Sequence, residues 1–281
     1  MAKASDIQID YQKQSFLFKG PFGFGKTLAA ASFAIEGPVF LSYWDKKSPV
    51  ELVSFFKRFG DIGKKILENI DYECYSANNA NAYLNKLIAL REDCRYVAII
   101  NDSLTFMTSA CVNWHLNFGK QNVERTIKNT IPSWDEYKSE TSIITQCMDI
   151  SKGLPCHVIW TAHPLPTTKI EGSSGSIKVN KVNSLVSYGS KVAGMVPGGF
   201  TEIYHFSQKS NWDSSAGKSS KQFIANLEGI DDEFAKSPML GDYIKEIDYT
   251  DKLFYQVWKN HILKVQGKEL IECANPISLL E

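Results

Sequence analysis

The chain has 281 residues, 43% of them hydrophobic and 22% charged, and its 31 basic residues equal its 31 acidic residues. These values are those of an ordinary globular protein with a sizeable core, and the zero net charge excludes a protein that holds nucleic acid through its overall charge. The six cysteines form no C-x-x-C pair and no apolar run is long enough to cross a membrane, so we expect a cytoplasmic protein that does not enter a membrane.

The strongest motif follows a short polar lead-in, residues 1–13. Residues 15–18 are an apolar run that predicts a strand, and after them come the sequence GPFGFGKT at 20–27 and an alanine-rich helix start. In the pattern G-x-x-x-x-G-K-[ST], the glycines let backbone N–H groups approach phosphates, the lysine reaches the β- and γ-phosphates, and the hydroxyl binds Mg²⁺. We therefore expect ATP and Mg²⁺ as cofactors, with Thr27 as a metal ligand. The expected nucleotide-binding residues are Gly20, Pro21, Phe22, Gly23, Phe24, Gly25, Lys26, Thr27 and Leu28.

The chain then alternates between strand and helix patterns. Apolar runs at 39–43, 96–100 and 156–161 predict buried strands, residues 70–75 predict an edge strand, and residues 106–132 predict a helix and a loop. Helices are expected over 50–59, 78–93 and 134–152, the first opened by a capping box that ends in Glu51 and closed by Gly60. This alternation predicts an α/β fold with a mainly parallel central sheet flanked by helices.

The second half of the chain has a different composition. Residues 167–191 are rich in Ser, Gly and Lys, and we expect a mobile loop there. Short strands are predicted at 200–206 and 221–227, and an aromatic helix is predicted at the end of 249–263. We accordingly expect three parts, which are the lead-in of residues 1–13, a P-loop core of residues 14–210, and C-terminal antiparallel strands and a helix at 211–281 that pack on the core.

Acidic residues follow two of the predicted strands, at the edge where ligands bind in open α/β sheets. Asp102 ends the run YVAIIN and fits a carboxylate that holds Mg²⁺ together with Thr27, although it could also simply cap a turn. Asp45 follows the second strand and is the best acid available to activate water, unless it is a loop carboxylate paired with Lys46 or Lys47.

His163 follows the fourth predicted strand and could hydrogen-bond the γ-phosphate and report its loss, or be a structural histidine in the turn at Pro164. The expected catalytic residues are thus Lys26, Asp45, Asp102 and His163.

The predicted loop carries four lysines against one acid, which suits single-stranded nucleic acid as well as it suits a solvated surface loop. Its candidate nucleic-acid residues are Lys169, Lys178, Lys181 and Lys191. A cation that completes the site of a neighbouring subunit is usually Arg, and Arg125 and Lys209 are the candidates for this role.

Together, the segments GPFGFGKT, FLSYWD, YVAIINDSLT and VIWTAHP resemble the RecA-like P-loop ATPases. They look closest to the phage-encoded members of that class, which include RecA-core single-strand annealing proteins, and the likeness spans about residues 14–262. The resemblance implies a RecA-like fold, Mg²⁺-dependent ATP hydrolysis, and action on single-stranded DNA in recombination, annealing or replication. It also implies a homo-oligomeric ring or filament that works with phage or host proteins. The family often has Glu after the second strand, where this chain has Tyr43-Trp44-Asp45.

Two other functions stay open at this point. Zero net charge and a single aromatic residue in the predicted loop, Tyr188, favour an ATP-gated assembly module with little or no hydrolysis. A nucleotide kinase also carries a P-loop, but it usually needs an arginine-rich lid, and no arginine follows residue 125. The choices between DNA and RNA and between ring and filament are likewise open.

Overall fold

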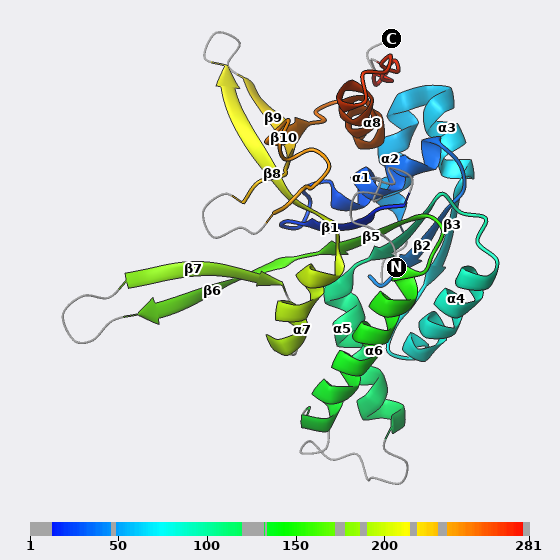
Figure 1. Ribbon diagram of the computed structural model, residues 1–281, viewed down its shortest axis with the longest axis vertical. Helices are drawn as coiled ribbons and strands as arrows, with labels where there is room; N and C mark the ends of the chain where they lie inside the picture. Colours follow the sequence, from blue (N-terminus) through cyan, green and yellow to red (C-terminus); the bar gives the residue numbers. More distant parts are fainter. Residues whose placement is uncertain are drawn as a thin grey trace, which may run out of the picture.

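The computed structural model describes residues 13–45, 49–119, 132, 134–171, 178–185, 190–213, 218–229 and 235–277. In this part of the chain, eight strands form one sheet in the order β10-β9-β8-β1-β5-β4-β2-β3, and two more form a separate ribbon (Figure 1). The sheet strands are β1 (Ser15–Lys19), β2 (Val39–Tyr43), β3 (Ile70–Cys74), β4 (Ala98–Asp102), β5 (His157–Ala162), β8 (Glu202–Asp213), β9 (Lys218–Asn226) and β10 (Glu246–Asp248). The ribbon strands are β6 (Pro164–Glu171) and β7 (Lys178–Leu185), which pair antiparallel.

The sheet is parallel from β8 to β3, and β9 and β10 extend it with antiparallel pairs. Strands β2, β4 and β5 are buried at every residue, because helices cover both faces, and this explains why each reads as an apolar run. The structure therefore confirms an α/β fold with a mainly parallel sheet and C-terminal antiparallel strands. In the same described part, no helix is both long and apolar enough to cross a membrane.

Two hydrophobic clusters lie on opposite faces of the sheet. One cluster draws on the helical elements α1 (Lys26–Ala31), η2 (Ser32–Ile35), α2 (Val50–Phe56), η3 (Lys57–Phe59), α3 (Gly60–Glu68) and α8 (Phe254–Val265). The other draws on α4 (Ala80–Glu92), α5 (Leu104–Trp114), α6 (Trp134–Lys152), α7 (Ser190–Met195) and η6 (Val196–Gly199), while η4 (His115–Gly119) continues α5. Figure 1 shows these two helical layers on either side of the strands.

The C-terminal helix packs on the central strand of the sheet. Trp258 of α8 lies against Phe16 of β1, with ring centroids 5.6 Å apart, and its indole N–H donates to the Tyr204 hydroxyl at 3.2 Å. The boundary expected at residue 210 falls inside β8, which forms a long hairpin with β9. Residues beyond 210 thus continue the same sheet and complete the same core.

Two segments differ from the sequence-based expectations. The segment 167–191, expected to be a loop, contains the β6–β7 ribbon and the start of α7, because antiparallel pairing satisfies the backbone hydrogen bonds of a polar segment. The second is α3, which the sequence analysis did not predict: Gly60 ends the helical segment of α2 and η3, as expected, with φ 55°, but the chain at once begins this further helix. Gly63 of α3 packs where a Cβ would lie 1.7 Å from the Phe56 carbonyl oxygen. Glycines here redirect the helix and allow close packing.

Candidate functional site

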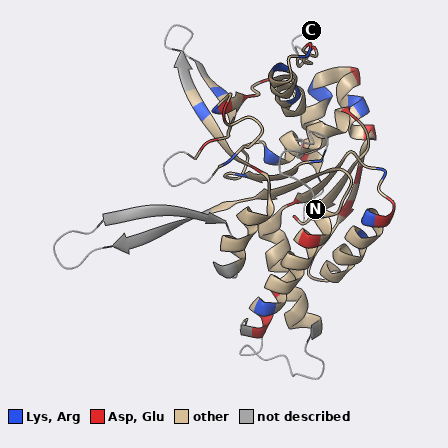
Figure 2. Cartoon of the chain, viewed as in Figure 1, with Lys and Arg blue, Asp and Glu red and all other residues tan. Residues whose placement is uncertain are grey.

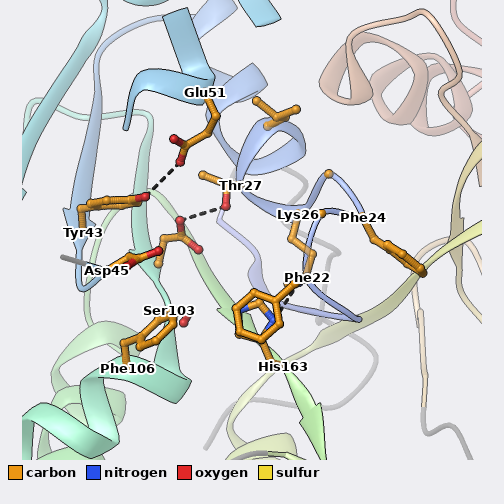
Figure 3. A pocket seen from close by; sticks show the side chains of 14 residues that line it. Phe22, Phe24, Lys26, Thr27, Tyr43, Asp45, Glu51, Ser103, Phe106 and His163 are labelled. Atoms are coloured by element: carbon orange, nitrogen blue, oxygen red, sulfur yellow. Dashed lines mark hydrogen bonds between the residues drawn. The ribbon is translucent and has the colours of Figure 1, made fainter. Parts of the chain in front are cut away.

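A cavity of about 250 Å³ lies at the carboxyl edge of the parallel strands, between the loop after β1 and the ends of β2, β4 and β5 (Figure 3). It brings together the expected catalytic residues Lys26, Asp45, Asp102 and His163, which are far apart in the sequence. The residues that line it are Phe22, Gly23, Phe24, Gly25, Lys26, Thr27, Leu28, Tyr43, Asp45, Glu51, Asp102, Ser103, Phe106 and His163.

The loop over residues 20–25 is held by contacts from the C-terminal third of the chain. A Cβ on Gly20 would lie 2.4 Å from the Phe206 carbonyl oxygen, and one on Gly25 would lie 2.9 Å from the Tyr249 hydroxyl. Tyr249 donates to the Phe24 carbonyl at 3.1 Å. The two glycines are therefore required by close approach as well as by their positive φ angles of 155° and 81°.

Lys26 and His163 meet at the base of the cavity. The Lys26 ammonium donates to the carbonyls of Gly20 at 2.7 Å and Pro21 at 2.8 Å, and it lies 3.2 Å from His163 Nδ1. Burial lowers the pKa of Lys26 to about 8, although the charge of Asp102 opposes this shift. Burial, reinforced by the charge of Lys26, lowers the pKa of His163 to about 3. The imidazole is therefore neutral at pH 7, and its Nδ1 accepts a hydrogen bond from the ammonium.

His163 is also fixed by its neighbours. Phe22 stacks on its ring, with centroids 3.6 Å apart and an interplanar angle of 16°, and the His163 amide donates to the Thr105 hydroxyl at 3.1 Å. The next residue, Pro164, begins β6. A single peptide bond thus separates the histidine that contacts Lys26 from the β6–β7 ribbon.

Asp102 is a buried carboxylate held by two hydroxyl groups. Thr27 Oγ1 donates to its Oδ2 at 2.9 Å, and Thr161 donates to Oδ1. Burial raises the pKa of Asp102, while these hydrogen bonds and the charge of Lys26 oppose the rise. Within the described residues, no group of three or more His, Cys, Asp or Glu side chains could hold a metal. A Mg²⁺ ion here would take oxygen ligands from Thr27 and Asp102 and the rest from phosphate and water, which suits its preference for few protein ligands.

Two side chains that the sequence did not single out line the same cavity. The Tyr43 hydroxyl donates to Glu51 Oε1 at 3.0 Å. Glu51 was expected in a capping box, but Pro49 occupies the N-cap position of α2 with no side-chain hydrogen bond, and the carboxylate turns to Tyr43 instead. The available signal was an acid in the first turn of the helix after the second strand, and the sequence analysis interpreted it as part of a capping box.

The remaining candidates lie elsewhere. Lys209 on β8 pairs with Glu246 on β10 at 2.8 Å and does not line the cavity. Lys169 is on β6, Lys178 and Lys181 are on β7, and Lys191 is in α7, all at positions whose side chains lie outside the described part. Arg125 lies wholly outside the described residues.

A second, more apolar cavity of about 150 Å³ also adjoins the loop. It shares Gly23, Gly25 and Leu28 with the first cavity, and Phe55, Phe223 and Tyr249 are among its walls. Arg58 and Asp251, which also line it, form an ion pair at 2.9 Å. Both cavities are thus lined by residues of the same glycine loop.

Comparison with protein-family models gives no match, and no curated protein matches the chain. The chain is therefore classified by its fold and its site alone. The chain is an α/β protein whose glycine loop, buried lysine and paired hydroxyl and carboxylate meet at the carboxyl edge of a mainly parallel sheet.

Proposed function

We propose that the protein is a RecA-like P-loop ATPase that binds ATP and Mg²⁺ and acts on single-stranded DNA in recombination, annealing or replication. Its proposed setting is the cytoplasm of a bacterial or phage-infected cell, as a homo-oligomer. The main support for the ATPase proposal is that Lys26, Thr27, Asp102 and His163 line one cavity beside the glycine loop.

Three of these residues have a role in binding the triphosphate and its metal ion. Lys26 carries its charge at neutral pH and is held by carbonyls that a phosphate can replace. Thr27 and Asp102 supply the hard oxygen ligands that Mg²⁺ prefers, and the ion would neutralise charge on the β- and γ-phosphates. The second cavity offers aromatic walls next to the loop, which suit the base of the nucleotide.

The single-stranded DNA part of the proposal rests on the β6–β7 ribbon, which projects from the body of the protein (Figure 1). Figure 2 shows basic and acidic residues interspersed along the other described elements of the chain, so a nucleic-acid contact needs a local element. The ribbon begins directly after His163. If the Lys26–His163 contact changes when the γ-phosphate leaves, the first residues of the ribbon would therefore move with His163. Such coupling would link ATP turnover to DNA binding.

The first experiment compares ATP binding and hydrolysis by the wild type, Lys26→Ala and the exposed control Lys64→Ala, with and without single-stranded DNA. We expect binding and DNA-stimulated hydrolysis in the wild type and the control, and loss of both in Lys26→Ala. Absence of ATP binding in the wild type contradicts the proposal. Tight binding without turnover in either condition favours the ATP-gated assembly module instead.

A second experiment tests the ribbon. Replacing Lys169, Lys178 and Lys181 together by Ala should weaken single-stranded DNA binding and flatten its salt dependence, with the slope falling by roughly 0.7 for each phosphate that the protein no longer neutralises. ATP binding should be unchanged in this variant, because all three positions are on the ribbon. Unchanged DNA affinity and salt dependence would contradict a role of the ribbon in DNA binding. A parallel titration with RNA shows which of the two nucleic acids the protein prefers.

A further inference from the structure

We propose that Glu51, held in place by Tyr43, is the carboxylate that orients and deprotonates the water that attacks the γ-phosphate. This inference rests on the ATPase function proposed above. It assigns the water-activating role to a residue of α2, and the sequence alone had assigned that role to Asp45.

The position of Tyr43 fixes the position of Glu51. Tyr43 is the last residue of β2 and pairs in register with Asp102 on β4, so both residues lie at the same edge of the sheet. The Tyr43 side chain is only 3% exposed, which holds its ring in place, and its hydroxyl donates to Glu51 Oε1 at 3.0 Å. Figure 3 shows the Glu51 carboxylate pointing toward Tyr43 on the side of the cavity opposite His163.

The hydrogen bond has a defined direction. Burial raises the pKa of Tyr43 above its ordinary value, and the hydrogen bond to Glu51 and the charges of Glu51, Asp102 and Asp45 raise it further. The phenol therefore keeps its proton, and because a carboxylate can only accept, the hydroxyl donates to Glu51 Oε1. Within the described residues Glu51 Oε2 makes no hydrogen bond, and the residue is exposed to solvent. One oxygen is thus held by the protein while the other is open to water.

Asp45 is the alternative acid, and its environment is different. It also lines the cavity and is half-buried, but no hydrogen bond or ion pair within the described part of the chain fixes its carboxylate. Orientation of a nucleophile contributes to catalysis only if the orienting group is itself held. Glu51 meets this requirement through Tyr43, and on this ground the structure favours Glu51.

The proposed step is a balanced hydrolysis. The water oxygen forms a bond to the γ-phosphorus, while the bond from that phosphorus to the β–γ bridging oxygen breaks and its electron pair goes to ADP. The water proton passes to Glu51 Oε2, which later releases it to solvent. The products are ADP and inorganic phosphate, and the carboxylate returns to its starting state.

The test uses the full chain as wild type, Glu51→Gln, Tyr43→Phe, Asp45→Asn and the exposed control Glu68→Gln on α3. Each is measured for ATP binding, for kcat and KM, and for its free energy of unfolding. A general base contributes roughly 10²–10⁴-fold, so Glu51→Gln should lose at least about 100-fold in kcat and keep its ATP affinity. Tyr43→Phe, a positioning variant, should lose about 10-fold in kcat with KM unchanged, since its ring and fold are retained.

Each outcome bears on one of the two proposals. If the wild type binds and hydrolyses ATP while Glu51→Gln keeps the wild-type kcat, only the Glu51 assignment fails. A larger loss of kcat in Asp45→Asn than in Glu51→Gln also overturns it, as does ATP binding without turnover in the wild type. A wild type that does not bind ATP overturns the ATPase function itself. The control Glu68→Gln, in an exposed ion pair with Lys64, should match the wild type in all measurements.

Discussion

At the scale of single residues, the unusual feature is a hydrogen bond between two basic side chains. Lys26 and His163 lie 3.2 Å apart in a buried setting, and the charge of Lys26 makes the charged form of His163 less favourable. The pair stays stable because only the lysine is charged and the neutral imidazole accepts from it. A phosphate beside Lys26 would give the ammonium another partner, so under the proposed function this pair is where a bound nucleotide would change the contact with His163.

This arrangement predicts a pH-dependent stability. The pKa of His163 falls from an ordinary value of 6.5 to about 3, so the folded chain binds fewer protons than the unfolded chain between these values. The free energy of unfolding should therefore decrease as the pH falls below about 6.5, with a contribution from His163 of about 1–2 kcal/mol between pH 7 and pH 5. Urea unfolding at both pH values should show this contribution in the wild type and not in His163→Gln. Equal pH dependence of the two proteins would contradict the prediction.

At the scale of elements, the glycine loop depends on strands that come later in the chain. Gly20 leaves β1 against the backbone of β8, and Gln208 of β8 donates to the Gly23 carbonyl at 3.0 Å. Tyr249, which follows β10, holds the loop through the hydrogen bond from its hydroxyl to the Phe24 carbonyl. The conformation that exposes backbone N–H groups to a ligand is thus a product of the sheet around the loop as well as of the loop sequence.

Gly20→Ala tests this dependence. Its Cβ would lie 2.4 Å from the Phe206 carbonyl oxygen, a backbone atom that cannot rotate away, and φ is 155°. We expect a loss of about 2–3 kcal/mol in the free energy of unfolding, measured by urea unfolding. The matched control is Gly198→Ala in η6, where a Cβ meets nothing within 4 Å, and we expect a change within about 0.5 kcal/mol. Similar values for both variants would show that the contact with β8 is unimportant.

At the scale of the whole molecule, the two ends of the described chain share one core. Phe16 on β1 contacts Phe33, Tyr204 and Trp258, which come from η2, β8 and α8. The polar atoms in this cluster are linked as well, since Trp258 donates to the Tyr204 hydroxyl and Tyr204 donates to the buried Glu202 carboxylate at 2.9 Å. The C-terminal helix is therefore part of the same core as the strand that leads into the glycine loop.

Trp258→Ala should consequently destabilise the whole protein. Removing a large buried aromatic side chain costs about 3–5 kcal/mol, and Trp258 is 1% exposed. Thermal unfolding followed by far-UV circular dichroism should show one transition, shifted to lower temperature. The control Tyr243→Ala removes a side chain that is 64% exposed, and its transition should match the wild type. A second, separate transition in the Trp258 variant would instead indicate that residues beyond 210 fold independently.

The sequence by itself determined much of the sheet and the identity of the glycine loop. Strands β2, β4 and β5 lie at or within two residues of their predicted ranges, because a strand buried on both faces needs a continuous apolar run. Helix α6 spans the predicted residues 134–152. The GPFGFGKT motif made Lys26 and Thr27 candidate site residues, and positions at strand ends made Asp102 and His163 candidates. All four line the same cavity. These features are local, and a local pattern is sufficient to encode them.

Only the tertiary structure decided which distant side chains meet. The Tyr43–Glu51 hydrogen bond, the contact of Gly20 with Phe206 and the support of Phe24 by Tyr249 each depend on how separate elements pack. The ribbon was missed because its largely polar sequence lacks the apolar periodicity that would indicate strands. Hydrophobic patterns specify where a segment is buried, but contacts between segments depend on the register and direction of the assembled sheet.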